Sequence, residues 1–261
     1  MNNAKIIAIT QPLIERSEVD DNGSKYNTYN MSPEEFLAYT ARVSNPSNQN
    51  NTLTAPKLLK YLIKNRHWSP FEMVSITMEI NTTRDISHQI IRHRSFSFQE
   101  FSQRYADPTK DMQFVTREAR LQDQKNRQNS IETDDEQLEN TWSRYQTNMI
   151  NHAKDSYEWS ISMGIAKEQA RAVLPEGLTS TRLYMAGTLR SWIHYIDVRA
   201  EAGTQKEHRE VALAAQQEIL KHFPSLEDYW NEPRYEVEEI ITKVPLEEVM
   251  REMKPWWKFW S

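Results

Sequence analysis

The spacing of apolar residues along the chain predicts a mixture of strands and amphipathic helices. The clearest strand pattern is residues 71–80, FEMVSITMEI, in which polar positions alternate with apolar ones: Val74, Ile76, Met78 and Ile80. A period of two is typical of an antiparallel strand with one buried face. Residues 5–10 (KIIAIT) and 181–186 (TRLYMA) are also expected to be short strands.

Helical patterns occupy much of the remaining chain. Ser32-Pro33-Glu34-Glu35 has the residues of a capping box, so we expect a helix to begin there with Ser32 as its N-cap. Apolar residues at i, i+3 and i+4 spacing predict further helices after Thr54 and over residues 83–93, 138–164, 166–174, 188–200 and 206–222.

Two segments depart from these patterns. Residues 120–136 carry almost no apolar side chains, which predicts a polar insertion at the surface. Residues 254–261, KPWWKFWS, form an aromatic tail that we expect to pack on its own or a neighbouring subunit, with a membrane or partner contact as the alternative. Neither a repeat nor a linker is evident. The chain, residues 1–261, is therefore expected to form a single α+β domain, an antiparallel sheet flanked by long helices.

Composition narrows the classes of function. The chain has 32 Lys and Arg against 37 Asp and Glu, so its net charge of −5 argues against a protein that coats nucleic acid. The absence of cysteine excludes disulfides, thiolate metal sites and a cysteine nucleophile. No apolar run approaches the roughly 18 residues of a membrane span, and the N-terminus does not resemble a signal peptide. We therefore expect a cytoplasmic protein without a nucleic-acid or membrane partner.

Two common kinds of site are also missing from the sequence. The five glycines lie too far apart for a dinucleotide fingerprint or a phosphate-binding loop, so side chains would have to hold any nucleotide. Neither H-E-x-x-H nor a cluster of histidines and carboxylates occurs, and we expect no metal site.

The segment RHRSFSFQEFSQRY, residues 92–105, concentrates positive charge in an acidic protein. Its arginines present planar forks of donors that match phosphate and carboxylate oxygens, which favours an anion pocket. The alternative is a solvated basic face, but such a face would not need the interleaved aromatic residues Phe96, Phe98 and Phe101.

Three further residues have competing interpretations. Arg199 falls on the apolar stripe of its predicted helix, so it needs either a ligand or a carboxylate such as Glu201 or Glu210. Arg171 is expected to cap the C-terminus of its helix. His67 has no obvious partner in the sequence, which favours a structural role over a catalytic one.

These residues resemble a known family. RHRSFSFQEFSQR matches the pattern R-H-R-x-x-S-x-x-x-x-S-x-R of the flavin-dependent thymidylate synthases, and HWSPFE, QARAVLP and RSWIHYIDVRA resemble its other conserved blocks. The similarity spans roughly residues 30–225. It implies reductive methylation of dUMP to dTMP, with methylenetetrahydrofolate as carbon donor and NADPH-reduced FAD as hydride source. It also implies a homotetramer with shared active sites. A route without an enzyme thiolate agrees with a chain that lacks cysteine.

The resemblance also assigns residues. It implies that Arg199, Glu100 and Ser102 are the catalytic residues: Arg199 would favour ionisation of the pyrimidine, and Ser102 would position the base. The implied dUMP contacts are Gln89, Arg92, Glu100, Phe101, Ser102, Gln103, Arg104, Arg171 and Arg199. The implied FAD contacts are His67, Ser69, Arg92, His93, Arg94, Gln99, Glu100, Thr188, Arg190 and His194. Gln99 stands where many members have asparagine.

Two rival hypotheses remain. A non-enzymatic nucleotide- or RNA-binding protein could use the arginine and aromatic residues of the segment, and would bind polynucleotides in a salt-dependent way. Another FAD-dependent uracil or RNA methylase could bind the flavin without turning over free dUMP.

Overall fold

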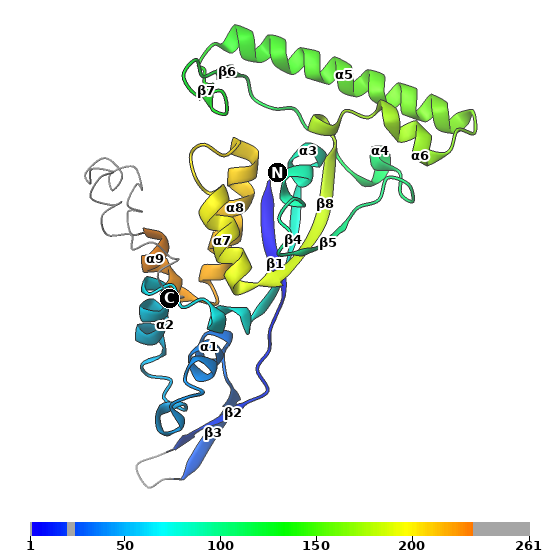
Figure 1. Ribbon diagram of the computed structural model, residues 1–261. Helices are drawn as coiled ribbons and strands as arrows, with labels where there is room; N and C mark the ends of the chain where they lie inside the picture. The colour runs from blue at the N-terminus through cyan, green and yellow to red at the C-terminus, as the bar shows by residue number, and fades with distance from the viewer. Residues whose placement is uncertain (1, 20–23, 232–261) are drawn as a thin grey trace, which may run out of the picture.

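The protein is built around an antiparallel sheet. The computed structural model describes residues 2–19 and 24–231. Within them the main sheet has the order β1 (Asn3–Ile9), β4 (Ser75–Thr83), β8 (Ser180–Thr188) and β5 (Ser97–Glu100). β4 and β8 pair along their whole length, from Ser75 opposite Thr188 to Thr83 opposite Ser180. The predicted strands and the α+β class are thus confirmed (Figure 1).

Helices cover the sheet and close the core. α7 (Leu189–Arg199) and α8 (Lys206–Leu220) pack beside each other, with α8 against β1 and β4 and α7 against β8. The apolar face of β4 is fully buried beneath them, as the alternation predicted. Trp192 of α7 lies at the centre of this core and donates its indole N–H to the carbonyl oxygen of Ile76, 3.2 Å away.

A smaller group of elements lies at one end of the sheet. It contains the hairpin β2 (Glu15–Val19) and β3 (Lys25–Asn30), and the helices α1 (Pro33–Ala41), α2 (Ala55–Lys64) and α9 (Glu227–Asn231). The capping box of α1 is confirmed, because Ser32 Oγ accepts from the Glu35 amide and the Glu35 carboxylate accepts from the Ser32 amide. The β2–β3 hairpin was not predicted.

The strand predicted from residue 71 begins later than expected. Residues Ser69–Glu72 form a 3-10 helix, η2, with Pro70 in its first turn, and β4 starts only at Ser75. Proline fixes φ near the helical value and cannot donate to a strand ladder, so it favours this turn over an extended chain.

Residues 108–178, called the arm below, project from the opposite end of the sheet (Figure 1). The arm holds α4 (Pro108–Asp111), β6 (Arg120–Gln122), β7 (Ser130–Glu132), α5 (Glu136–Ser162) and α6 (Lys167–Ala170). α5 is the predicted long helix, and it ends before Gly164, whose φ of 78° suits glycine. The polar segment 120–136 contains the hairpin β6–β7, with most side chains exposed. The aromatic tail 254–261 lies outside the described residues.

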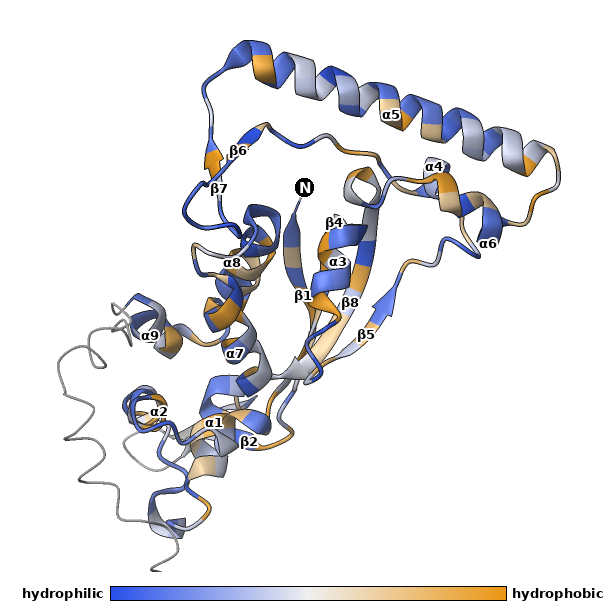
Figure 2. Cartoon of the chain, turned by 45° about the horizontal axis from the view of Figure 1, so that its top comes forward, coloured by the Kyte–Doolittle hydropathy of each residue, from blue (hydrophilic) through white to orange (hydrophobic). Residues whose placement is uncertain are grey.

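One row of α5 residues, among them Ile150, Ala153 and Tyr157, is buried. A neighbouring row is apolar but exposed: Tyr145, Met149, Trp159 and Met163. These positions recur at spacings that place them on one side of a helix. Figure 2 shows scattered hydrophobic positions among hydrophilic ones along α5. None of the helices in the described ranges is long and apolar enough to cross a membrane.

Candidate active site

The motif of residues 92–105 divides into three parts. Arg92 and His93 follow the end of α3 (Arg84–Ile90), the next residues form a turn, and residues 97–100 form the edge strand β5. Arg104 lies beyond β5. The four residues of β5 span about 10 Å, at 3.3 Å per residue, and this strand separates Arg92 and His93 from Arg104. The arginines of one chain are therefore spread along the sheet edge.

Phe96 anchors this motif to the body of the protein. Its ring packs edge-on against Trp192, with ring centroids 4.9 Å apart, and against Tyr195 at 6.1 Å. The backbone of β8 comes so close that a Cβ on Gly187 would lie 2.4 Å from the Phe96 ring. Phe98 also packs against the core. Two of the three aromatic residues thus serve to hold the motif in place.

His93 and Arg199 join the motif to the end of α7. Arg199 Nε donates to His93 Nε2 at 3.0 Å, which requires a neutral imidazole with a lone pair at Nε2. Burial, aided by the charges of Arg199, His194 and Arg92, lowers the pKa of His93 from 6.5 to about 4. Neither of the carboxylates considered from the sequence pairs with Arg199 in the described chain, and Glu210 accepts from Asn2 instead. The guanidinium is therefore held by a neutral partner.

Gln89 belongs to the same cluster. Its Nε2 donates to Gln205 Oε1 at 2.8 Å, and its Oε1 lies 3.3 Å from Nδ1 of His208. His208 is fully buried, and burial lowers its pKa to about 3, with Arg199 as the next cause. The other ring nitrogen of His208 lies 3.1 Å from the hydroxyl of Tyr195, whose pKa is raised by burial.

His208 and Tyr195 were not predicted as site residues. A signal for His208 was present, because the buried apolar residues Val211, Ala212 and Ala215 follow it at i+3, i+4 and i+7. A histidine on a buried helix face needs hydrogen-bond partners.

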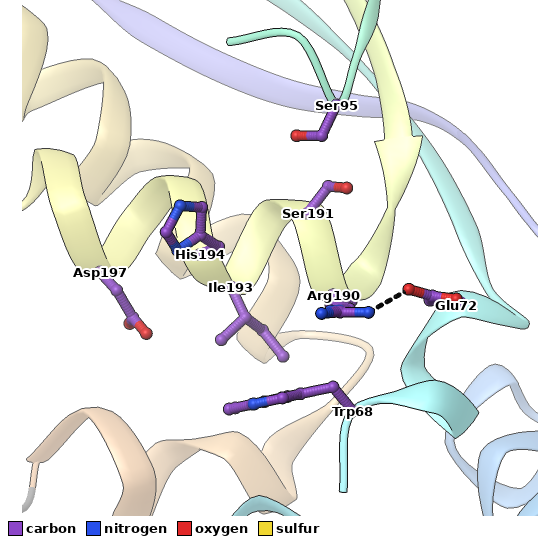
Figure 3. A pocket seen from close by; sticks show the side chains of 8 residues that line it. All are labelled: Trp68, Glu72, Ser95, Arg190, Ser191, Ile193, His194 and Asp197. Atoms are coloured by element: carbon purple, nitrogen blue, oxygen red, sulfur yellow. Dashed lines mark hydrogen bonds and ion pairs between the residues drawn. The ribbon is translucent and has the colours of Figure 1, made fainter. Parts of the chain in front are cut away.

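A cavity of about 400 Å3 opens between α7 and η2. Its lining, labelled in Figure 3, consists of Trp68, Glu72, Ser95, Arg190, Ser191, Ile193, His194 and Asp197. Arg190 reaches across the opening to the Glu72 carboxylate. The resemblance implied Arg190 and His194 as flavin contacts, and both line this cavity together with Asp197 of the same helix. Trp68, Glu72 and Ser191 were not anticipated.

The other predicted cofactor residues do not line this cavity, but some of them are neighbours in the chain of residues that do. Ser69 is the first residue of η2 and directly follows Trp68. His67, the residue before Trp68, is exposed, and its ring packs edge-on against that of Tyr61. Thr188 caps α7, because its hydroxyl accepts from the Ser191 amide at 3.3 Å. Arg94 and Gln99 are exposed on the motif.

The predicted phosphate contacts lie toward the arm. Arg104 is exposed and pairs with Glu168 of α6 at 3.7 Å, and Arg171 follows at the C-cap of α6, as its capping interpretation predicted. Ser102 Oγ accepts from the Arg104 amide at 3.4 Å. The next residue, Gln103, is buried, and Phe101 is half-buried.

Glu100, the last residue of β5, connects this strand to β8 and to α3. Its carboxylate accepts from Thr181 Oγ1 at 2.9 Å and pairs with Arg84 at 3.4 Å. These two bonds fix the carboxylate at the end of β5 from which the chain continues to Arg104.

Besides the cluster of Gln89, His93 and Arg199, two sets of predicted residues lie toward opposite ends of β8. Arg171 lies in the arm, before this strand, whereas Arg190 and the other α7 residues of the cavity follow it in the chain. The arm and the start of α7 lie at opposite ends of β8 (Figure 1). β8 has nine residues and spans roughly 27 Å at 3.3 Å per residue. A single chain does not bring Arg171 and Arg190 to one small ligand.

No group of three or more histidine, aspartate or glutamate side chains placed to hold a metal ion occurs among residues 2–19 and 24–231.

Comparisons with known proteins identify the family. The family described as "Thymidylate synthase complementing protein" matches residues 27–225. A flavin-dependent thymidylate synthase from a Synechocystis strain is 52% identical over 196 residues, covering 75% of this chain and 88% of that protein. A probable flavin-dependent thymidylate synthase of Paramecium bursaria Chlorella virus 1 is 45% identical over 224 residues, covering 86% of this chain and 96% of that protein.

The fold agrees with a solved structure. A UMP/dUMP methylase, PolB from Streptomyces cacaoi, bound with 5-Br dUMP, has a TM-score of 0.70 at 22% identity, over 88% of this chain and 94% of that chain. The likeness to that structure concerns the fold, and the sequence relatives and the family match decide the family. The chain belongs to the flavin-dependent thymidylate synthase family.

Proposed function

We propose that this protein is a flavin-dependent thymidylate synthase, which methylates dUMP to dTMP with methylenetetrahydrofolate as carbon donor and NADPH as reductant. Relatives of that name match most of their length at 45% and 52% identity. The observation in the structure that carries the proposal is the contact of His93 with Arg199. It joins the motif to a cation that pairs with no carboxylate of the described residues.

The cavity at α7 suits the flavin cofactor, FAD. Its size falls in the range of small-molecule sites, and Trp68 and Ile193 offer an apolar wall to a flat ring. Arg190 and His194 are the donors that would hold the anionic part, and His67 and Ser69 lie beside them in the chain. When bound, FAD supplies the hydride for the methyl group.

Arg199 is the residue that would activate the nucleotide. A cation beside the pyrimidine stabilises the form that has lost its N3 proton, and this form is the better nucleophile. The neutral His93 orients the guanidinium through Nε and leaves its other N–H groups for the ligand.

Arg104 and Arg171 would bind the phosphate of dUMP. Arg104 sits beyond the edge strand, and Arg171 at a helix C-terminus, where no helix dipole would assist anion binding. Their guanidinium forks must therefore supply the attraction. Ser102 and Glu100 would hold this end of the motif in register through the bonds described above, so Ser102 positions the nucleotide and does not attack it.

We also propose that the protein works as a homotetramer with shared sites. The separation of Arg171 from Arg190 along β8 supports a site assembled from more than one chain. The exposed apolar row on α5 supports association, because such a row on a helix marks an interaction surface.

The visible absorption spectrum of the purified protein tests the activity. We expect flavin bands that bleach on addition of NADPH, faster when dUMP is present, and formation of dTMP once methylenetetrahydrofolate is added. UMP should be compared with dUMP in the same assay. A protein that takes up no FAD, or one that reduces FAD but leaves dUMP unmethylated, would contradict the proposal.

A further inference from the structure

A chain of side-chain hydrogen bonds runs from the core into the arm. It connects, in order, Tyr195, His208, Gln89, Gln205, Glu207 and Arg120. The Gln205 amide nitrogen donates to Glu207 Oε2 at 3.0 Å, and the guanidinium of Arg120 pairs with Glu207 Oε1. Glu207 and His208 are both buried. The chain passes beside the proposed site, because the ring of His208 lies edge-on to that of His93, with centroids 6.5 Å apart.

The ion pair between Arg120 and Glu207 fixes which group donates and which accepts in each hydrogen bond of this series. A carboxylate only accepts, so Gln205 must present its nitrogen to Glu207 and its oxygen to Gln89. Gln89 must then donate to Gln205 and turn its own oxygen toward His208. His208 therefore carries its proton on Nδ1, and its Nε2 accepts from the hydroxyl of Tyr195. In the reverse direction, the Gln205 oxygen would face the carboxylate without a proton between them.

We infer that His208 is a positioning residue, which locks the Gln89 amide so that its nitrogen serves as a donor to dUMP. One N–H of Gln89 is used by Gln205, and the second remains for the ligand. The phosphate and carbonyl oxygens of dUMP are acceptors, so an amide fixed in this orientation matches them and a flipped amide repels them. The inference rests on the proposed function, which takes Gln89 as a dUMP contact.

Two variants of His208 separate this role from a merely structural one. Asparagine places its amide near the position of Nδ1 and can still donate to Gln89, whereas glutamine places its amide near Nε2 and reaches only Tyr195. In the FAD-loaded protein we expect His208→Gln to weaken dUMP binding about tenfold, the cost of one misdirected hydrogen bond to a charged ligand. His208→Asn should weaken it less. KM for dUMP should rise with little change in kcat.

A double-mutant cycle provides the decisive measurement. In a Gln89→Ala background, His208→Gln should have no further effect on the Kd for dUMP, because it acts through Gln89. Additive losses, or equal losses in His208→Asn and His208→Gln, would overturn the inference.

Glu207→Gln offers an independent variant. It keeps the shape of the side chain but lets the chain of hydrogen bonds run in either direction, so it should raise the same Kd with His208 intact. An unchanged Kd in this variant would overturn the inference. FAD content and the unfolding midpoint show that each variant is folded. A wild-type protein that binds FAD but no dUMP would contradict the proposed function, and with it the role of His208. A wild type that binds dUMP together with unaffected variants would contradict the role of His208 alone.

Discussion

Gly187 shows how a single residue shapes the site. The motif approaches β8 so closely that any side chain at this position meets the ring of Phe96. Phe96 in turn is held by Trp192 and Tyr195, so it has little room to move aside. The motif can therefore lie this close to β8 only because residue 187 is a glycine, which has no side chain.

Gly187→Ala should lower the free energy of unfolding by about 1–3 kcal/mol, the usual cost of overpacking a filled core. Chemical denaturation measures this loss. Gly203→Ala is the matched control, because a Cβ there would meet nothing within 4 Å. Equal stability of the two variants would mean that Phe96 can relax.

Arg199→Ala should abolish dTMP formation while FAD stays bound. The cofactor cavity is lined by α7 residues other than Arg199, so flavin absorbance should be retained. Loss of the cation should remove the stabilisation of the ionised pyrimidine, a change in kcat/KM of at least about a hundredfold. Turnover at the wild-type rate would remove Arg199 from the site.

His208 should make the protein sensitive to acid. Its pKa is about 3 in the folded protein and 6.5 when exposed, so between these values the unfolded chain binds a proton that the folded chain does not. The contribution of His208 to the free energy of unfolding is therefore fully present above pH 6.5. It falls by about 1.4 kcal/mol for each pH unit between 6.5 and 3. Urea unfolding at pH 7, 6 and 5 should show a shallower loss for His208→Gln than for the wild type. Parallel curves would assign the acid sensitivity to other groups.

At the scale of elements, α5 presents a surface that single residues do not reveal. Trp159→Glu should weaken assembly, because it puts a charge into the exposed apolar row, and light scattering should report a smaller particle. Asn151→Glu is the matched control, since Asn151 is exposed on a different side of the same helix. If both variants assemble like the wild type, this row of α5 does not form the interface.

Helices and strands with a regular spacing of apolar residues or a local capping motif could be predicted from the sequence. Elements whose conformation depends on tertiary contacts could not. The alternation of β4 and the capping box of α1 act locally, so the sequence alone was sufficient. The β2–β3 hairpin has mostly polar residues and no such pattern. Residues 166–174, predicted as one helix, divide into α6 and a 3-10 turn at Arg171, ahead of Leu174 and Pro175.

The site was predictable in part for the same reason. The motif, Arg190, His194 and Arg199 could be found because they follow a family pattern. His208, Gln205 and Glu207 matter through contacts with residues over 80 positions away in the sequence, such as Arg120 and Gln89. No local sequence pattern predicts a hydrogen-bond partner that is so far away in the sequence.

At the scale of the whole molecule, shared sites can be tested by mixing inactive chains. Arg171→Ala and Arg190→Ala should each inactivate the protein, since one removes a phosphate contact and the other a cofactor contact. If one site takes these arginines from different chains, mixed oligomers should regain about a quarter of the wild-type activity, the fraction of sites that receive both arginines intact. No recovery in oligomers shown to be mixed would place both arginines in one chain's site.

The pairing of β4 with β8 also affects the synthesis of the protein. Thr83 pairs with Ser180, so the ribosome must translate the whole arm before the central strand gains its second neighbour and the helices that cover it. At typical rates of translation this interval lasts roughly 5–20 seconds. Throughout it, the apolar face of β4 remains open to other nascent chains. Chains that end within the arm should therefore aggregate, and refolding of the full chain should be slow.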